Sequence, residues 1–518
     1  MFKLKQPVEA FNYKYMQQIT LFAWLGFVLL ILAVVAAVAV LATRSIWVDE
    51  ATLLTSIYHI DFSQVLQPLP FYDQASPVLP LVFTKLIALI AGTNIALFRV
   101  LLFTVNIAFA APLLIHILKE KGVISAGCLT LTFVAVIYSI GYYFSEIKHY
   151  GFEAAAVFLF LYWFVIYIDN QEKALSARLI WIPPFVVYMG FSTLLIAPAL
   201  LAYIAIDTFL AHQFKPKAWQ LSIKKHLKLG IVLALACVVG YIQMKQLTLF
   251  QMGNTWSQQI YGHKGLSADI SSLYIAFVEA FSLKYLYLVV LSSVLALFLN
   301  AKTIVFKLNL FFISLIMLIV VLKILGLYPV LSGRHLVWIL PISMLLIALA
   351  IPALLQTKIP LFFTLALVLF AALGLMVANN VVILGKGLNG EVTSNNDLYL
   401  KLSQQPKSDV FVFVAAQASL EIDQMQHKMP HQFYGLSQSE RLSSMKPLAS
   451  EQAFSDWQFA QMPQTKAFLM IISHDKELDA APASKRVLAL RSTLAKNKCV
   501  YESIYSGKDV QLLNVNCH

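Results

Sequence analysis

The sequence predicts an α-helical polytopic membrane protein that carries a small α/β domain at its C-terminus. Of its 518 residues, 59% are hydrophobic and 12% are charged, whereas a soluble domain is roughly 45–50% apolar and about 25% charged. The mean hydropathy is +0.75. The net charge of +12 does not indicate a nucleic-acid binder, because such a protein displays its basic residues on a solvated surface.

The long apolar runs stop near Ala378, which divides the chain into two predicted domains. Residues 1–378 hold 24 Lys and Arg against 13 Asp and Glu, whereas residues 379–518 hold 14 against 13. We therefore expect a transmembrane domain over 1–378, with a first outer loop at about 44–77. An extracytoplasmic domain is expected over 379–518.

Eleven segments of the first domain are predicted spans, because a membrane-spanning helix needs about 20 mostly apolar residues. Prolines interrupt the fifth and sixth segments. The shorter apolar stretch Pro77–Gly92 is expected to form a re-entrant or interfacial helix. The predicted spans are 18–43, 95–118, 124–144, 150–168, 178–191, 192–211, 228–248, 280–300, 304–325, 335–355 and 359–378.

The basic residues at the ends of these spans predict a cytoplasmic N-terminus, because cytoplasmic loops retain Lys and Arg. One alternating set of loops holds about half as many of them as the other set. With eleven spans, the tail after Ala378 then lies outside. The first apolar run is too long for the apolar core of a signal peptide and is expected to be an uncleaved anchor.

The tail has the pattern of a small α/β unit. Short apolar runs predict strands at 409–416 and 467–473, helical spacing covers 483–496, and two closing strands, 499–506 and 510–517, flank Gly507. Cys499 and Cys517 both fall in this exported tail, where a disulfide could persist. No grouping of Cys and His suggests a structural metal.

Three groups of polar residues lie on the predicted outer face. Asp49 and Glu50 open the first outer loop, Glu146, Lys148 and Tyr150 begin the fourth span, and Arg334 and His335 precede the tenth. Spacing would place Glu146, Tyr150 and Glu153 on one helical face. Each group also has a purely structural interpretation: a helix N-cap at Asp49, interfacial snorkelling at Lys148, and an Arg334 paired with a lipid headgroup.

These acids and bases, with Lys264 from a later outer loop, suit group transfer from an anionic lipid carrier. A carboxylate can accept the proton of an attacking hydroxyl. Cationic side chains can stabilise the charge that grows on a departing phosphate. The chain has neither a P-loop nor a GxGxxG motif that would indicate a soluble nucleotide.

The ordered set of motifs resembles the C-type membrane glycosyltransferases (GT-C) of family 39, which include protein O-mannosyltransferases and bacterial lipid A aminoarabinose transferases. The resemblance covers roughly residues 1–378. It rests on WVDEA after the first span, Arg99 early in the next full span, SEIKHYG at the fourth span and SGRHLVWILP at the tenth. It implies inverting transfer of a sugar from a polyprenyl-phosphate-linked donor to an acceptor hydroxyl or phosphate.

The resemblance also implies roles for the matching residues. Asp49 corresponds to the catalytic base and Glu146 to a second catalytic acid position, with Glu50 and Tyr150 supporting the acceptor. The donor phosphate would be bound by Lys148, Arg334, His335 and Lys264. Two features depart from the family: Ser76-Pro-Val-Leu-Pro80 stands where Pro-Pro-Leu-Tyr-Tyr is common, and His335 stands where Tyr often follows the Arg.

The tail does not resemble the sugar-binding insert of eukaryotic O-mannosyltransferases, which favours a protein of the bacterial inner membrane. The expected partners are a polyprenyl-phosphate sugar, membrane lipids and a glycolipid, polymer or protein acceptor, with no nucleic acid. No cofactor is certain, although Asp49 and Glu50 could hold a divalent metal ion through oxygen ligands. Two alternatives remain open: a transporter or flippase for a polyprenyl-linked glycan, and an envelope assembly factor with a degenerate transferase core.

Overall fold

A computed structural model describes most of the helical part of the chain and the strands of its tail. Contacts divide the chain into two compact units, one of Met1–Ala42, Asp61–Pro68 and Ala75–Glu391, the other of Thr43–Ile60, Leu69–Gln74 and Val392–His518. The described residues are 24, 26–39, 41, 48–67, 69, 76–92, 94–212, 215–252, 265–328, 332–357, 359–386, 405, 409–413, 432–434, 467–473, 492, 494–506 and 510–517.

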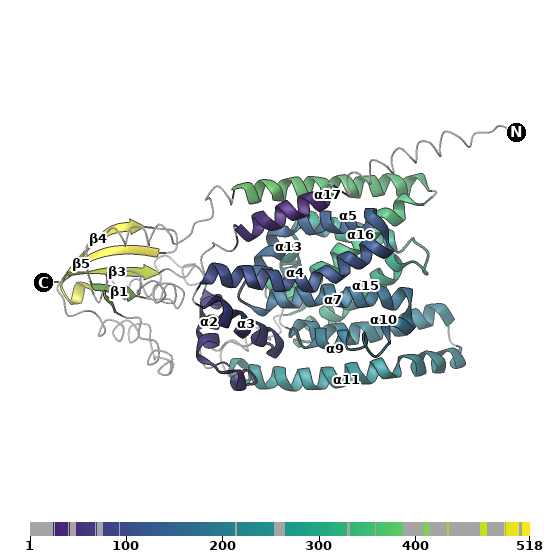
Figure 1. Cartoon of the computed structure of the whole chain (residues 1–518), viewed down its shortest axis with the longest axis horizontal. Helices are drawn as coiled ribbons and strands as arrows, with labels where there is room; N and C mark the ends of the chain where they lie inside the picture. Colours follow the sequence, from purple (N-terminus) through teal and green to yellow (C-terminus); the bar gives the residue numbers. More distant parts are fainter. Residues whose placement is uncertain are drawn as a thin grey trace. The chain divides into compact units, whose positions relative to one another are not determined.

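The first unit is helical throughout its described residues (Figure 1). It begins with the apolar helix Gly26–Ala39. The elements that follow are η1 (Phe62–Gln64), α3 (Val78–Ala91), α4 (Ile95–Glu120), α5 (Gly122–Ala135), α6 (Ile137–Ser145), α7 (His149–Asp169), α8 (Gln171–Ala174), α9 (Ile182–Val187), η2 (Ser192–Leu195), α10 (Ile196–His212), α11 (Pro216–Met252), α13 (Leu266–Phe281), α14 (Leu283–Ala296), α15 (Ile304–Ile324), η3 (Gly333–Ile339), α16 (Leu340–Leu355) and α17 (Pro360–Lys386).

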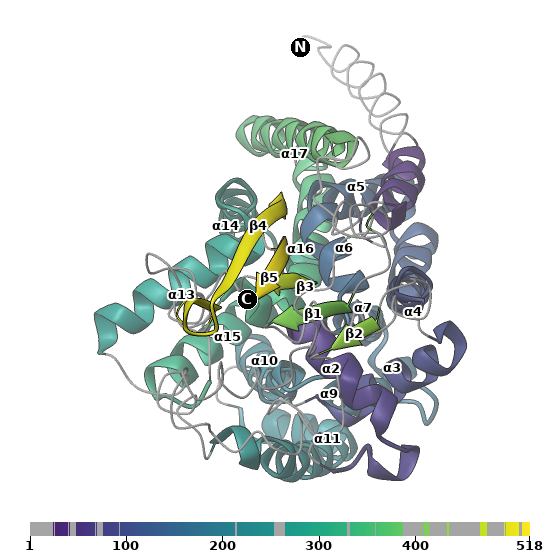
Figure 2. The same cartoon turned by 90° about the vertical axis from the view of Figure 1, so that its left-hand side faces the viewer.

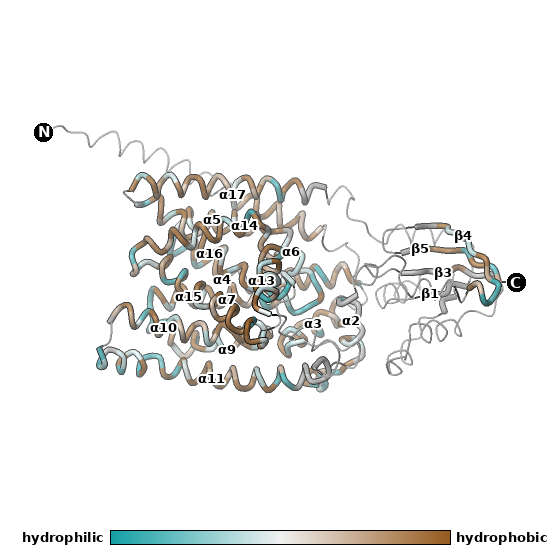
Figure 3. Tube along the Cα trace, turned by 180° about the vertical axis from the view of Figure 1, so that it is seen from behind, coloured by the Kyte–Doolittle hydropathy of each residue, from teal (hydrophilic) through white to brown (hydrophobic). Residues whose placement is uncertain are grey.

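The helices confirm a multi-span membrane protein. Within the described residues, seven helices are long and apolar enough to cross a membrane, or up to nine if each of two bent pairs is one span. The bent pairs are α5 with α6 and α13 with α14. The axes of α13 and α14 differ by 100°. In Figure 3 hydrophobic residues predominate along the bodies of α10, α11, α16 and α17.

Two predicted spans differ from the structure. The segment 178–191 contains only the six-residue helix α9, which starts with prolines in its first turn and ends at Val187. The segment 280–300 begins in the last turn of α13 and crosses the break before α14, where Ser282 has a φ of 56°. A positive φ interrupts a helix because the L side chain then approaches the following carbonyl oxygen. Pro77–Gly92 does form a short apolar helix, α3.

Helices α7 and α16 form the centre of the first unit. In the apolar stretch of α7, 83% of the residues are buried, and in that of Gly333–Leu355, which contains α16, 89% are buried. In the apolar stretch of α11, only 17% are buried. Figure 2 looks along the helices and shows α4, α5, α11 and α14 around this pair. A helix that is apolar all round is stable only inside a large core or a membrane, which accounts for the uniformly apolar α16.

The second unit contains α2 (Val48–His59) and a sheet of five strands. The strands are β1 (Asp409–Phe413), β2 (Gln432–Tyr434), β3 (Ala467–Ser473), β4 (Cys499–Ser506) and β5 (Val510–Cys517), in the order β2-β1-β3-β5-β4. Strand β1 is parallel to β2 and β3, whereas β5 is antiparallel to β3 and β4.

The small α/β domain expected in the tail is confirmed by these strands. The predicted closing strands β4 and β5 pair with each other, and their register opposes Cys499 to Cys517. A disulfide joins these two cysteines. Strand β2 has no counterpart in the sequence prediction, and most of the helix predicted over 483–496 lies outside the described residues.

Candidate functional site

The first part of the site is the break between α6 and α7. Helix α6 ends at Ser145, Glu146 follows with extended backbone angles, and Lys148 is the extended residue before α7. The prediction that Glu146 shares a helical face with Tyr150 is therefore wrong, because Glu146 precedes the helix. The break brings three functional groups into one short segment: both Glu146 and Lys148 are buried, and Tyr150 is 9% exposed.

This break is fixed by contacts from other helices. The buried Asn106 of α4 donates a hydrogen bond from Nδ2 to the carbonyl oxygen of Phe144 at 3.0 Å. This bond satisfies one of the carbonyls that a helix end leaves without an intrahelical partner. At Gly151, a Cβ would lie 2.2 Å from the carbonyl oxygen of Tyr143. Only glycine therefore lets α7 pass so close to the end of α6.

The second part of the site is the start of the 3-10 helix η3. Gly333 packs against α13, where a Cβ would lie 2.5 Å from the Ala280 nitrogen. Its own N–H donates to Glu279 Oε2 at 2.7 Å. The carbonyl oxygen of His335 accepts from Trp338 Nε1 at 2.9 Å and from the Tyr328 hydroxyl at 3.1 Å. These bonds fix the backbone on both sides of Arg334.

The two parts meet at Tyr150. The Arg334 guanidinium carbon lies 5.9 Å from the centre of the Tyr150 ring, within the range of a cation–π contact. The His335 ring is also 5.9 Å from Tyr150, and the Tyr143 ring is 6.2 Å away. Glu146, Arg334 and Glu279 all act electrostatically on Tyr143.

We call these side chains the Arg334 cluster. It comprises Tyr143, Glu146, Lys148, Tyr150, Arg334 and His335. Lys148 is included because it stands at the break before α7, two residues from Tyr150. A planar guanidinium is suited to binding a phosphate, because it can donate two parallel hydrogen bonds to it. The carboxylate of Glu146 offers a place for a proton or for a hydroxyl donor.

The structure brings five of the predicted site residues into this cluster: Glu146, Lys148, Tyr150, Arg334 and His335. Helix α2 begins at Val48, so Asp49 lies inside its first turn and does not precede it as an N-cap. Glu50 is fully buried, and burial raises the pKa of Tyr58 on the same helix to about 12. The Asp49 side chain and all of Lys264 lie outside the described residues.

Sequence reasoning did not point to Tyr143 or Glu279, and it placed His149 and Glu153 near Tyr150 without giving either of them a role. Glu279 stands at the end of an apolar segment, and an acid within a membrane segment is itself a signal of function. Tyr143 had no such signal, because tyrosine is common near membrane interfaces. The family-like Arg99 is fully buried in α4.

No group of three or more His, Cys, Asp or Glu side chains within the described residues could hold a metal ion.

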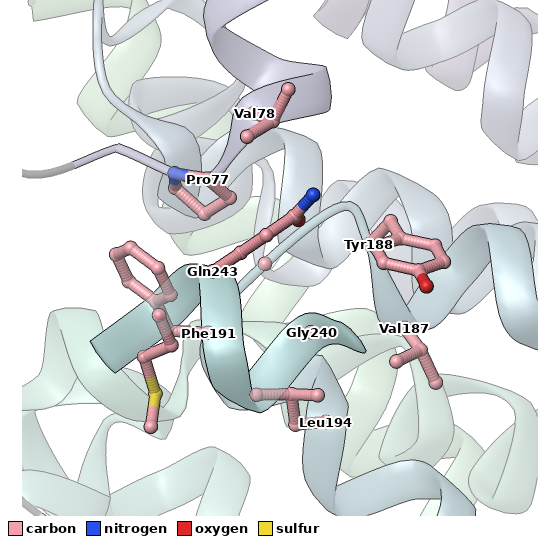
Figure 4. A pocket seen from close by; sticks show the side chains of 10 residues that line it. Pro77, Val78, Val187, Tyr188, Phe191, Leu194, Gly240 and Gln243 are labelled. Atoms are coloured by element: carbon pink, nitrogen blue, oxygen red, sulfur yellow. The ribbon is translucent and has the colours of Figure 1, made fainter. Parts of the chain in front are cut away.

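A pocket lies beside the first turns of α7 and is lined by Pro77, Val78, Val187, Tyr188, Gly190, Phe191, Leu194, Gly240, Gln243 and Met244 (Figure 4). Its lining is mostly apolar, and Gln243 extends its amide among these residues.

The chain has the fold of the C-type membrane glycosyltransferases. It is similar to two crystal structures of ArnT from Cupriavidus metallidurans. The structure bound to undecaprenyl phosphate has a TM-score of 0.53 at 10% identity, covering 95% of this chain and 98% of that one. The apo structure has a TM-score of 0.51 at 11% identity, covering 95% and 97%.

Structural similarity at such low sequence identity shows a shared fold and shows neither a shared family nor a shared reaction. No protein-family model matches the chain, and no curated protein sequence matches it either. The GT-C fold expected from the motifs is thus confirmed, while membership of family 39 stays a prediction.

Proposed function

We propose that this protein is a membrane glycosyltransferase that moves a sugar from a polyprenyl-phosphate-linked donor to an acceptor hydroxyl or phosphate, with inversion. The GT-C fold supports the class of enzyme. A fold neighbour that binds undecaprenyl phosphate supports the class of donor.

The observation that carries this proposal is the Arg334 cluster. Arg334 lies against the Tyr150 ring, and Lys148 stands two residues before Tyr150 at the start of α7, so both cations belong to the same region of the fold. The cluster also holds the acid Glu146, so it offers cations for an anionic donor beside a group that can bind an acceptor hydroxyl. A phosphate with two negative oxygens is the ligand that the two cations would stabilise.

In the proposed reaction, the oxygen of the acceptor attacks the anomeric carbon of the sugar as the bond from that carbon to the phosphate oxygen breaks. Asp49, by its resemblance to the family's catalytic residue, accepts the acceptor proton. The leaving polyprenyl phosphate gains the electron pair and the negative charge. Arg334 and Lys148 would stabilise that charge, while Glu146 would orient the acceptor.

The proposal includes an orientation in the bacterial inner membrane. The distribution of Lys and Arg favours a cytoplasmic N-terminus, and this arrangement would expose the tail with its disulfide to an oxidising compartment. The transfer would then take place on the outer face of the membrane.

The test compares envelope glycolipids and glycoproteins by mass spectrometry in cells with wild-type protein, with Asp49→Asn and without the protein. Loss of one sugar from one acceptor, both without the protein and in Asp49→Asn, is the expected result. In a purified assay with that donor, removal of a general base costs about 10²–10⁴-fold in rate. Glu120→Gln, an exposed acid at the end of α4, is the control and keeps the wild-type rate.

An envelope with unchanged sugars in all three strains contradicts the proposal. If the protein moves a labelled polyprenyl-linked glycan across the membrane of a vesicle and transfers no sugar, it is instead a transporter of that glycan. Sugar transfer at the wild-type rate by Asp49→Asn would overturn the assignment of Asp49 alone.

A further inference from the structure

A buried acid and a buried histidine face each other on the first turns of α7. His149 Nε2 lies 3.9 Å from Glu153 Oε1, and the two residues are 9% and 1% exposed. Within the described residues, His149 Nδ1 and Glu153 Oε2 make no hydrogen bond. Such unsatisfied buried polar atoms destabilise a fold, so core stability does not explain why the chain keeps this pair.

Glu153 is fixed by the segment between α9 and η2. Its Oε1 accepts a hydrogen bond from the backbone nitrogen of Ser192 at 3.2 Å. Gly190 makes room for the side chain, since a Cβ there would lie 2.1 Å from Glu153 Cγ. The carboxylate is therefore held in one place by backbone that belongs to a different part of the fold.

His149 connects Glu153 to the Arg334 cluster through ring contacts. Its ring centre lies 4.4 Å from that of Tyr150 and 5.5 Å from that of Phe191. Tyr150 in turn contacts Arg334 and His335. The contacts thus run without interruption from Glu153 through His149 and Tyr150 to the guanidinium.

We propose that Glu153 is a positioning residue for the donor phosphate, which acts through His149 and the Tyr150 ring to set the orientation of Arg334. The Glu153 side chain lies 3.9 Å from His149 Nε2 and so limits the positions open to the imidazole ring. The ring keeps Tyr150 against the guanidinium, and Arg334 presents its N–H groups to the phosphate. The inference rests on the proposed function, because it needs a phosphate at Arg334.

The test measures binding of undecaprenyl phosphate in detergent to wild-type protein, Glu153→Gln, His149→Gln and the double variant, together with the Tm of each. Glu153→Gln is nearly isosteric and keeps an acceptor for the Ser192 N–H, but it removes the acidic group that faces His149. We expect each single variant to weaken binding about tenfold and the double variant to be no weaker than His149→Gln, because coupled neighbours are not additive.

The control is Asp269→Asn, which removes another buried carboxylate that pairs with a lysine, Lys323, at 3.6 Å. It should leave the affinity for undecaprenyl phosphate at the wild-type value. A structural role for Glu153 would instead lower the Tm without changing the affinity of the folded protein, and this outcome overturns the inference.

Additive losses in the double variant also overturn it, because they mean that Glu153 does not act through His149. If wild-type protein binds undecaprenyl phosphate and Arg334→Ala weakens binding while Glu153→Gln does not, the positioning role fails and the proposed function stands. If wild-type protein does not bind the lipid, both fail together.

Discussion

Helix α7 has two halves that are equally buried and differ in content. Its first turns carry His149, Tyr150 and Glu153, whose polar atoms are buried within the fold. Its second half is an aromatic cluster in which the Phe160 and Phe164 rings lie 5.3 and 5.0 Å from Phe311. Figure 1 shows both halves as one continuous helix.

The difference teaches that burial alone does not separate structural from functional residues in this fold. Aromatic pairs at these distances stabilise a core beyond the area that they bury, so the second half contributes to stability. Buried ionisable groups cost stability unless they are paired, so the first half is kept for another purpose. The two halves should therefore respond to substitution in opposite ways.

The largest effect on the donor should come from Arg334→Ala. Loss of a charged hydrogen-bond donor to phosphate typically costs about 2–3 kcal/mol, which raises the KM for the polyprenyl-phosphate sugar roughly 30- to 150-fold. The KM for the acceptor should stay within about twofold, as measured by steady-state kinetics with each substrate varied. An equal loss for both substrates would mean that Arg334 does not act on the phosphate.

Gly151→Ala should have the next largest effect. The new methyl group meets the Tyr143 carbonyl oxygen and pushes α7 away from α6, which displaces Glu146 and Tyr150 together. Overpacking of this kind costs about 1–3 kcal/mol, so both the Tm and the transfer rate should fall. The matched control is Gly230→Ala in α11, where a Cβ meets nothing within 4 Å; a fall of similar size there would disprove the local cause.

Substitutions in the aromatic second half of α7 should have the smallest effect on the binding of the donor. Phe164→Leu leaves space beside Phe311 and Tyr203 and should lower the free energy of unfolding by about 1–3 kcal/mol. The affinity of the folded protein for undecaprenyl phosphate should change less than about twofold. Phe209→Leu, at a partly exposed position of α10, should alter neither property. A large loss of affinity in Phe164→Leu would remove the distinction between the two halves.

Local patterns predicted the uniform elements well. Helices α15 and α16 follow from apolar runs of spanning length, and β3 matches the predicted strand 467–473 residue for residue. Such elements depend on composition and periodicity, both of which are properties of a local window. The pairing of β4 with β5 is also local, since the two strands are close neighbours in the sequence.

The breaks in the helices were harder to predict because distant residues determine them. The end of α6 depends on Asn106, which lies 38 residues before Phe144 in the sequence. Glu279 joins the site only because Gly333 approaches α13 closely. The motif residues Glu146, Lys148 and Arg334 were found as candidates, but their mutual arrangement comes from these long-range contacts.

The central claim is that the Arg334 cluster binds the phosphate of a polyprenyl donor. The most direct test compares the binding of undecaprenyl phosphate with that of undecaprenol, which lacks the phosphate, to wild-type protein and to Arg334→Ala. We predict that the wild-type protein prefers the phosphate lipid by at least about tenfold and that Arg334→Ala loses most of this preference. A preference that survives unchanged in Arg334→Ala would contradict the account.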